Sequence, residues 1–462
     1  MQRRFKLLEG LLKYLIAATI LVIPLYQKFP FMRVKGTFVA IRLEDFLIAA
    51  LALVTFFLII PRFKDFLRDE INRAIVLFLV VGLISLLSGI FLIDTVVPSV
   101  GLLHWLRRIE YFIPFFAGAL AISINKRNLE LYLKLIVIVV AIAFIYGFGQ
   151  KHFSWPIIIT QNLEYSKGIA LSYVPGSHIN STFAGHYDLA TFLVLVLPII
   201  ISAAFLLKGV STKIVLLITG FCGLWLLVNA VSRISILSYL VSCSLALFLI
   251  RKYKAIVFVG AASLVIMLFL GLSTNLGARY TRLIEVTKEK IFNVNYVLLQ
   301  EVFAQETSLP KKLQVTLTPT PTPVFEDRSA SIRLNVEWPR ALRALSKNPL
   351  LGTGYSSITL ATDNDYLRLL GETGLLGFLA FFLIWTKIGT LLIRALPLKK
   401  NYKGLELVFL AGLLGALPGI FLNAFFIDVF EASKLATIFW LLTGMMVQLT
   451  KKGVYEQKRY TK

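Results

Sequence analysis

Cysteine, histidine and charge are all scarce in this sequence. Its 462 residues include two cysteines and four histidines, and only 16% of the residues are charged. Cys222 and Cys243 stand in apolar stretches without CxxC spacing, so we interpret them as small buried side chains and predict no disulfide framework. The histidines show no H-x3-H spacing, and the sequence therefore predicts neither a metal centre nor a cofactor.

Acidic residues are fewer than basic ones. There are 25 Asp and Glu against 48 Lys and Arg, which gives a formal net charge of +23. The basic residues are spread over the flanks of apolar segments and are not gathered in one domain with interleaved aromatic residues. This distribution is typical of membrane topology, and it argues against nucleic acid as a partner.

Apolar residues, in contrast, are abundant. They make up 57% of the chain, and the mean hydropathy is +0.79, so we predict an all-α, polytopic membrane protein. We expect about twelve spans, including a retained first helix. They lie near residues 11–27, 43–61, 73–93, 107–124, 129–149, 184–207, 213–231, 234–250, 254–272, 371–393, 404–425 and 433–450.

Every second connection between these spans is short and basic, which predicts the orientation. The basic connections and both termini are expected in the cytoplasm, and the loops 150–183 and 273–370 on the outer side of the inner membrane. We therefore divide the chain into residues 1–272, with nine spans and the 150–183 loop, a large extracytoplasmic loop 273–370, and residues 371–462, with three spans and a basic tail.

The large loop contains two contrasting stretches. Residues 279–303 show helical spacing with mixed charge, which predicts a helix along the membrane surface. The Thr-Pro repeat of residues 316–323 cannot hold a helix and predicts an extended linker.

A polar stretch, residues 331–377, then leads into a hydrophobic segment. Arg333, Glu337 and Arg340 follow helical spacing and would share one face, while Pro339 would bend this helix or set a new start. Residues 348–354, NPLLGTG, break the helix. Asp363 follows shortly before the next apolar run.

Five short segments of the chain resemble one known family. They are Ser232-Arg233, the entry 181-STFAGHYDLA-190, the NPLLGTG turn, 364-NDYL-367 and 372-ETGLLG-377. Together they resemble the superfamily of O-antigen ligases and Wzy-type polymerases, which are membrane glycosyltransferases. The resemblance implies transfer of a glycan from a polyprenyl (undecaprenyl) pyrophosphate carrier outside the cytoplasmic membrane. The ligase pattern has a histidine where this chain has Asp363.

The resemblance also implies a site. Permanently charged arginine binds phosphate oxygens in a bidentate way, so the pyrophosphate and glycan would be held by basic residues. The candidates are Arg233, Arg333, Arg340, Arg108, His178 and His186. The acceptor hydroxyl needs a proton acceptor. Asp363 is the first candidate, and Asp365 and Glu337 are the reserves.

Each of these residues also has a structural interpretation. Arg233 would otherwise be an arginine that snorkels at a tight turn, and Arg108 an interfacial anchor. Asp363 would N-cap the next span, with Asp365 in its first turn. Glu337 would only bridge Arg333 and Arg340 along a helix. His178 and His186 flank a predicted turn, and Ser181, Thr182 and Asp188 there also fit helix caps.

Two classes of function fit a chain of this kind. A lipid-linked glycan polymerase or ligase, acting on an acceptor glycan, lipid or protein for cell-surface polysaccharide assembly, requires arginines on the outer face and a large outer loop. A transporter or flippase of lipid-linked glycans requires charged or broken helices at mid-membrane, and the predicted spans are nearly free of them. The sequence favours the enzyme and leaves polymerase and ligase open.

Overall fold

A computed structural model describes residues 2–27, 29–33, 40–158, 171–175, 177–272, 331–359 and 361–460. The predicted surface helix 279–303 and the linker 316–323 lie outside these residues.

Each of the twelve predicted spans falls on a helix. Within the described residues these helices are α1 (Gln2–Leu25), α2 (Leu43–Ile59), α4 (Glu70–Phe91), α5 (Pro98–Ile124), α6 (Asn128–His152), α8 (His186–Leu206), α9 (Val210–Asn229), α10 (Arg233–Leu249), α11 (Tyr253–Leu272), α15 (Asp365–Arg394), α17 (Gly404–Asn423) and α18 (Ser433–Tyr460). The short helices α3 (Phe63–Arg68), α14 (Trp338–Lys347) and α16 (Leu398–Asn401) connect or flank them.

The protein is a multi-pass membrane protein. Nine helices of the described part are long and apolar enough to cross a membrane, with α2 and α3 counted as one span. The three helices on predicted spans that fall outside this count are α5, α10 and α18. Helix α10 has only 17 residues, α5 carries Arg107, Arg108 and Glu110, and α18 ends in a basic tail.

The prediction of an all-α chain is confirmed, and one short hairpin adds to it. Strands β1 (Pro30–Arg33) and β2 (Ala40–Arg42) pair antiparallel between α1 and α2. Aromatic and β-branched residues such as Phe31 and Ile41 favour extended backbone. No helix or strand is predicted from the sequence in this short connection.

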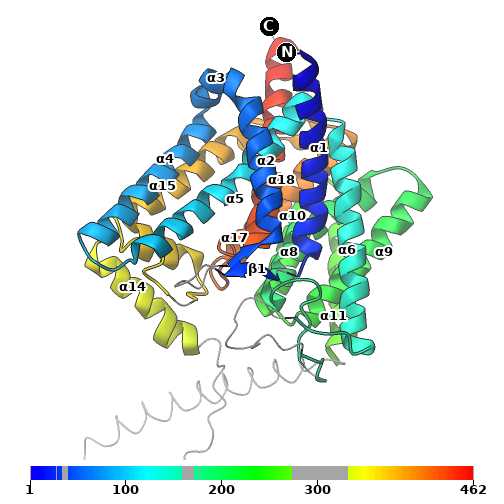
Figure 1. Ribbon diagram of the computed structural model, residues 1–462. Coiled ribbons are helices and arrows are strands. Elements are labelled where there is room, and N and C mark those ends of the chain that lie inside the picture. The colour runs from blue at the N-terminus through cyan, green and yellow to red at the C-terminus, as the bar shows by residue number, and fades with distance from the viewer. Residues whose placement is uncertain are drawn as a thin grey trace, which may run out of the picture.

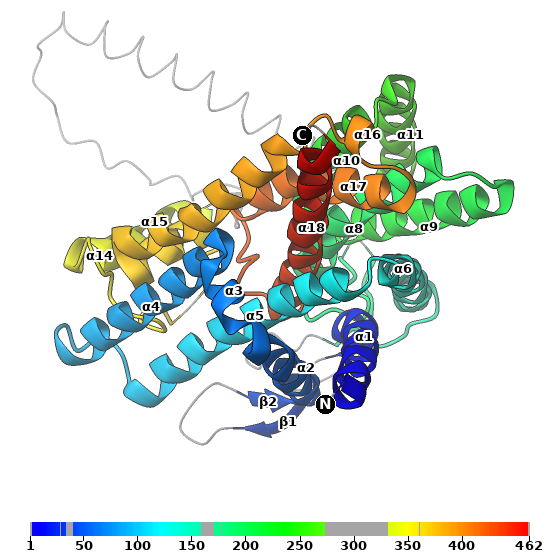
Figure 2. The same cartoon turned by 90° about the horizontal axis from the view of Figure 1, so that it is seen from above.

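The helices pack around two buried ones. Helix α8 is apolar on all sides and buried along nearly its whole length, as expected for a helix surrounded by protein. It packs against α17, which also contacts α10, while α18 packs against α5 and α15 against α4. Figure 2 shows α15 and α4 running side by side away from this centre.

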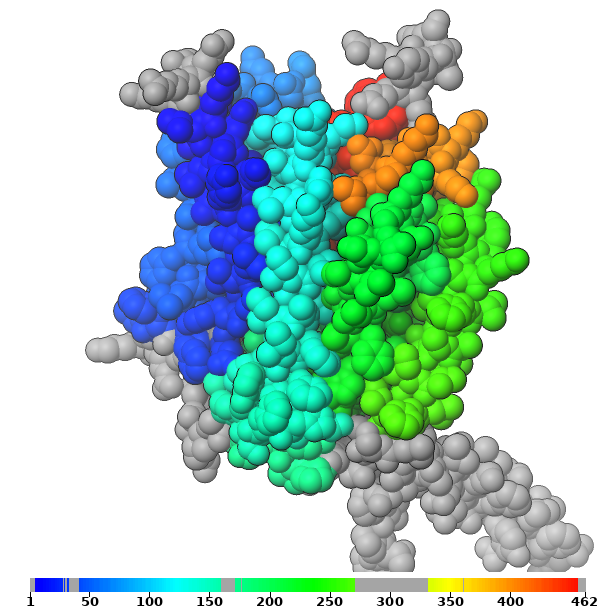
Figure 3. Space-filling view, turned by 90° about the vertical axis from the view of Figure 1, so that its right-hand side faces the viewer, coloured from blue at the N-terminus to red at the C-terminus, as the bar shows by residue number. Residues whose placement is uncertain are grey.

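Large apolar side chains cover the outside of the bundle. Figure 3 shows α6 in cyan beside α9 in green, and both expose such side chains, among them Ile142 and Ile145 of α6 and Ile218 and Phe221 of α9. An uncovered apolar surface of this extent fits a lipid environment.

The two chain ends lie at the same end of the bundle, and α14 and the β-hairpin lie at the opposite end (Figure 1). This arrangement agrees with an even number of spans. The side of the membrane that each end faces stays a prediction from the basic connections.

Candidate functional site

The polar stretch forms two helical segments that meet between Glu337 and Trp338. Residues Arg333–Glu337 are a π-helical turn, and α14 starts at Trp338 with Pro339 near its beginning. Proline is tolerated in a first helical turn because the N–H groups there have no partner inside the helix. Of the two outcomes predicted for Pro339, the new start is the one observed.

The NPLLGTG turn fills a break in α15. Gly374 has non-helical backbone angles (φ 65°, ψ −170°) inside α15. The 349–354 segment satisfies the backbone groups around the break: Leu375 N–H donates to Pro349 O (2.9 Å) and Gly354 N–H to Glu372 O (2.8 Å). Irregular backbone in a membrane helix requires such internal partners. The turn therefore holds the first part of α15 at a fixed angle.

Arg333 and Asp363 form an ion pair at this end of the bundle. The Arg333 Nε and Nη2 groups both donate to Asp363 Oδ2, at 3.0 and 2.8 Å. The side chains are only 14% and 28% exposed. Burial raises the pKa of Asp363 above its usual value, although the Arg333 guanidinium beside it lowers the pKa. The pair is therefore shielded from solvent, and its carboxylate is more basic than an ordinary one.

Asp428 holds the loop that carries Asp363. Its Oδ2 accepts from Thr362 N–H (3.1 Å) and its Oδ1 from Asn364 N–H (3.2 Å). Asp363 sits between these anchor points with a left-handed backbone (φ 47°). Nothing in the sequence links Asp428 to a loop 64 positions earlier.

The interpretation of Asp363 as a helix cap is wrong. Asn364 caps α15, and its side chain accepts from Leu367 N–H at 3.0 Å. The carboxylate of Asp363 is instead turned to Arg333, and Asp365 occupies the first turn of α15 as expected.

Glu337 and Arg340 lie beside this pair. The pKa of Glu337 is raised to about 7, mainly by burial and also by the Asp363 carboxylate, against the lowering effect of Arg333. The buried Glu337 Oε2 and Arg340 Nη1 have no hydrogen-bond partner among the described residues. The structure therefore brings together four of the predicted site residues, Arg333, Glu337, Arg340 and Asp363, in one partly buried cluster.

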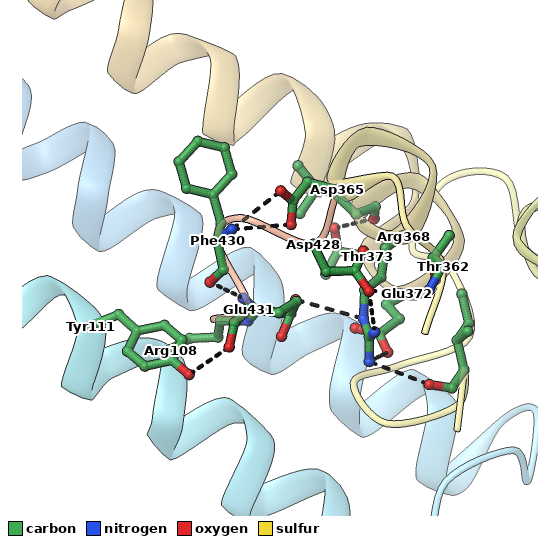
Figure 4. Close-up of polar contacts among 12 residues, drawn as sticks. Arg108, Tyr111, Thr362, Asp365, Arg368, Glu372, Thr373, Asp428, Phe430 and Glu431 are labelled. Carbon is green, nitrogen blue, oxygen red and sulfur yellow. Dashed lines mark hydrogen bonds and ion pairs between the residues drawn. The ribbon is translucent and has the colours of Figure 1, made fainter. Parts of the chain in front are cut away.

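Asp365 belongs to a second, deeper polar network (Figure 4). Its buried carboxylate accepts from the backbone N–H groups of Val429 (2.7 Å) and Phe430 (3.2 Å), so it fixes the turn before α18. Arg368, which is not among the predicted site residues, lies 3.6 Å from Glu372, 3.5 Å from Asp428 and 3.6 Å from Glu431. Its spacing of four residues from Glu372 was the available signal.

Arg108 joins the same network from α5. It pairs with Glu431, donates to Phe430 O at 3.3 Å, and lies 5.5 Å from the ring centroid of Tyr355. Its guanidinium is thus committed to protein groups. Arg108 also lines a narrow cavity, together with Glu372 and aromatic side chains, among them Phe112, Phe381 and Trp440.

The rings of the two predicted histidines are in contact, tilted by 32° to each other. The ring centroids of His178 and His186 are 3.8 Å apart, and His186 lies 4.0 Å from the ring of Tyr187. The Tyr187 side chain in turn interacts with Arg333. The histidines therefore border the Arg333 cluster. Within the described ranges, no group of three or more His, Cys, Asp or Glu side chains is placed to hold a metal ion.

Arg233 is the first residue of α10, directly after its cap Ser232. Two residues further, Ser235 contacts Asn423 at the end of α17 (3.4 Å), and the next chain segment leads to Asp428. Arg233 thus lies at the same end of the bundle as Arg333. That the two arginines bind one anion stays a prediction.

One comparison with known proteins finds a match to part of the chain. Residues 215–382 match the family model described as O-antigen ligase, Wzy_C. The matched range begins within α9 and ends within α15, and it includes Arg233, Arg333, Glu337 and Asp363. It leaves out His178, His186 and the 428–431 turn. No curated protein matches the chain.

Proposed function

Because residues 215–382 form an O-antigen ligase domain, we propose that this protein transfers or polymerises glycan units from a polyprenyl diphosphate carrier at the outer face of the cytoplasmic membrane. The family implies a lipid-linked glycan as substrate. The arrangement that carries the proposal is the Arg333–Asp363 pair, which sets an anion-binding fork directly beside a carboxylate of raised pKa.

The proposed reaction is a substitution at the anomeric carbon of the donor sugar. An acceptor hydroxyl forms the new glycosidic bond, the bond from that carbon to the diphosphate oxygen breaks, and the hydroxyl proton passes to the base. Arg333 stabilises the charge on the leaving diphosphate because its planar fork matches phosphate oxygens. Arg233 and Arg340 are proposed as further contacts to the diphosphate, and His178 and His186 as contacts to the glycan.

Asp363 is the proposed base. Its carboxylate is partly exposed, at 28%, and has a raised pKa, which suits proton transfer near neutral pH. The Asp365 carboxylate is buried and occupied by two backbone N–H groups, which supports a structural role instead. Glu337 stays the reserve candidate for the base. Because the Arg108 guanidinium already has partners within the protein, a positioning role is favoured for it over binding of the substrate.

A transporter or flippase is the other class that we considered. The helix break at Gly374 would suit a transporter, but the 349–354 segment fills it with backbone hydrogen bonds. The charged network also gathers at the end of the bundle that holds α14. These observations support the enzyme.

The glycans made by a deletion strain test the proposal and separate its two forms. Loss of long chains, with single units still attached to their acceptor, indicates a polymerase. Full-length chains that stay on the lipid carrier indicate a ligase. Unpolymerised lipid-linked units that accumulate on the cytoplasmic side would instead indicate a flippase and would contradict the proposal.

A further inference from the structure

We infer that Asp363 and the donor diphosphate compete for Arg333, so that the proposed base is released only when the donor binds. This inference rests on the proposed function and adds an order of events to it. Three observations carry it: the atoms that form the ion pair, the way in which the loop is anchored, and the effect of Arg333 on the Asp363 carboxylate.

The ion pair occupies the edge of Arg333 that a phosphate would use. Nε and Nη2 lie on one edge of the guanidinium group, and both donate to the same Asp363 oxygen at 3.0 and 2.8 Å. A phosphate group bound in bidentate fashion takes two such parallel donors. A diphosphate on this edge must therefore displace the carboxylate.

The loop can stay in place while the Asp363 side chain moves. Asp428 holds the backbone on both sides of Asp363, through the N–H groups of Thr362 and Asn364. Rotation of the side chain alone breaks the contact with Arg333. A displaced carboxylate thus stays within a side chain's reach of the bound donor.

Displacement also makes the carboxylate a stronger base. Burial and Asp428 raise the pKa of Asp363, and Arg333 is the neighbour that lowers it. Once the guanidinium faces a diphosphate, that lowering is lost and a second negative charge lies nearby. The donor would then both free and activate the base, whereas an enzyme without donor keeps it neutralised by Arg333.

The histidine of the ligase pattern, at position 363, would not form this ion pair with Arg333. A neutral imidazole offers arginine no opposite charge, and a protonated one repels it. The competition is therefore a consequence of the aspartate at position 363.

Binding of inorganic pyrophosphate to the purified full-length protein in detergent, measured by calorimetry, tests the competition. Asp363→Asn removes the competing charge and keeps a residue type that tolerates the left-handed backbone. We expect its dissociation constant for pyrophosphate to fall at least about tenfold below that of the parent. Asp363→Gly, which also tolerates this backbone, should give the same direction.

Asp45→Asn is the matched control. Asp45 also pairs with a partly buried arginine, Arg107, at 2.8 Å, with exposures of 22% and 19% for the arginine and the aspartate. If the loss of any negative charge tightened pyrophosphate binding, Asp45→Asn would bind pyrophosphate more tightly to the same extent as Asp363→Asn. We expect instead that its dissociation constant equals that of the parent. In Asp363→Asn combined with Arg333→Gln, the gain should disappear.

Unchanged or weaker pyrophosphate binding in Asp363→Asn and Asp363→Gly would overturn the inference, and so would the absence of binding in every variant. Unchanged or weaker binding would mean that Asp363 orients Arg333 for the donor instead of blocking it. A parent protein that transfers glycan but shows this result refutes the competition alone. A parent that transfers no glycan refutes the proposed function.

Discussion

At the scale of single residues, Arg333 is the side chain on which the proposed chemistry depends most. Arg333→Lys keeps the charge but loses the planar fork, so we expect most glycan transfer to be lost while the protein stays in the membrane. The measure is the amount of mature glycan that the variant restores in a deletion strain. Arg343→Lys, at an exposed position of α14, should restore the parent level.

Asp363→Asn separates the proposed base from a structural role. Asn364 provides the helix cap in the variant as in the parent, so expression and folding should be unchanged. Without a carboxylate, we expect turnover with a lipid-linked donor to fall by about 10² or more. Parent-level turnover would show that Asp363 is not the base and would direct attention to Glu337.

Glu337 should make stability depend on pH. Its folded pKa of about 7 lies above the ordinary value of 4.5, so the folded protein holds this proton more tightly than the unfolded chain. The resulting stabilisation is present below pH 4.5 and is lost as pH rises to about 7.

Glu337→Gln tests this because glutamine stays neutral. The melting temperature of the variant relative to the parent should rise by on the order of 1 °C between pH 4.5 and 7, since the group is partly exposed. It should level off above that range. A difference that is the same at pH 5 and pH 8 would show that the Glu337 carboxyl titrates normally.

At the scale of elements, the break in α15 couples the membrane bundle to the site. A Cβ at Gly374 would lie 2.3 Å from Leu350 O, and the φ of 65° disfavours other residues. Gly374→Ala should therefore cost at least about 1–3 kcal/mol of stability from backbone strain alone. Thermal unfolding in detergent measures this loss.

Gly389 provides the matched control within the same helix. No atom lies within 4 Å of its added Cβ, so Gly389→Ala should be neutral or stabilising by up to about 1 kcal/mol. Equal destabilisation by both substitutions would mean that the loop does not depend on the break at Gly374.

The sequence predicted the helices better than it predicted their ends. Long apolar runs locate spans because lipid requires them, and all twelve runs are helical in the structure. The predicted span 371–393 leaves out the first six residues of α15, which starts at Asp365, because Asp365 and Arg368 make this part of the helix polar. They are helical and buried because they pair with the 428–431 turn, a partner that is distant in sequence.

The same reasoning explains which site residues were found. Arg333, Glu337, Arg340 and Asp363 stand in one short stretch, so a family resemblance and helical spacing sufficed to group them. Asp428 comes from beyond α17 and acts through backbone N–H groups, which no residue pattern reveals. The prediction that Arg108 lies near the outer end of its helix stays a prediction, and its pairing with Glu431 depends on how α5 packs against α18.

At the scale of the whole molecule, the proposal requires the end with α14 to face outward. We expect Lys347→Cys to react with a membrane-impermeant thiol reagent in intact cells, and Lys400→Cys only after lysis. Both positions are exposed, and both variants need Cys222 and Cys243 replaced by alanine. The reverse labelling would place the site in the cytoplasm, where the proposed reaction does not occur.

The most direct measurement is glycan transfer by the purified protein in lipid vesicles that contain an undecaprenyl diphosphate-linked oligosaccharide and its acceptor. We predict a new glycosidic product together with free undecaprenyl diphosphate, and little of either with Arg333→Lys. Recovery of the lipid-linked oligosaccharide intact, even if it has crossed the bilayer, would contradict the assignment of this protein as a glycosyltransferase.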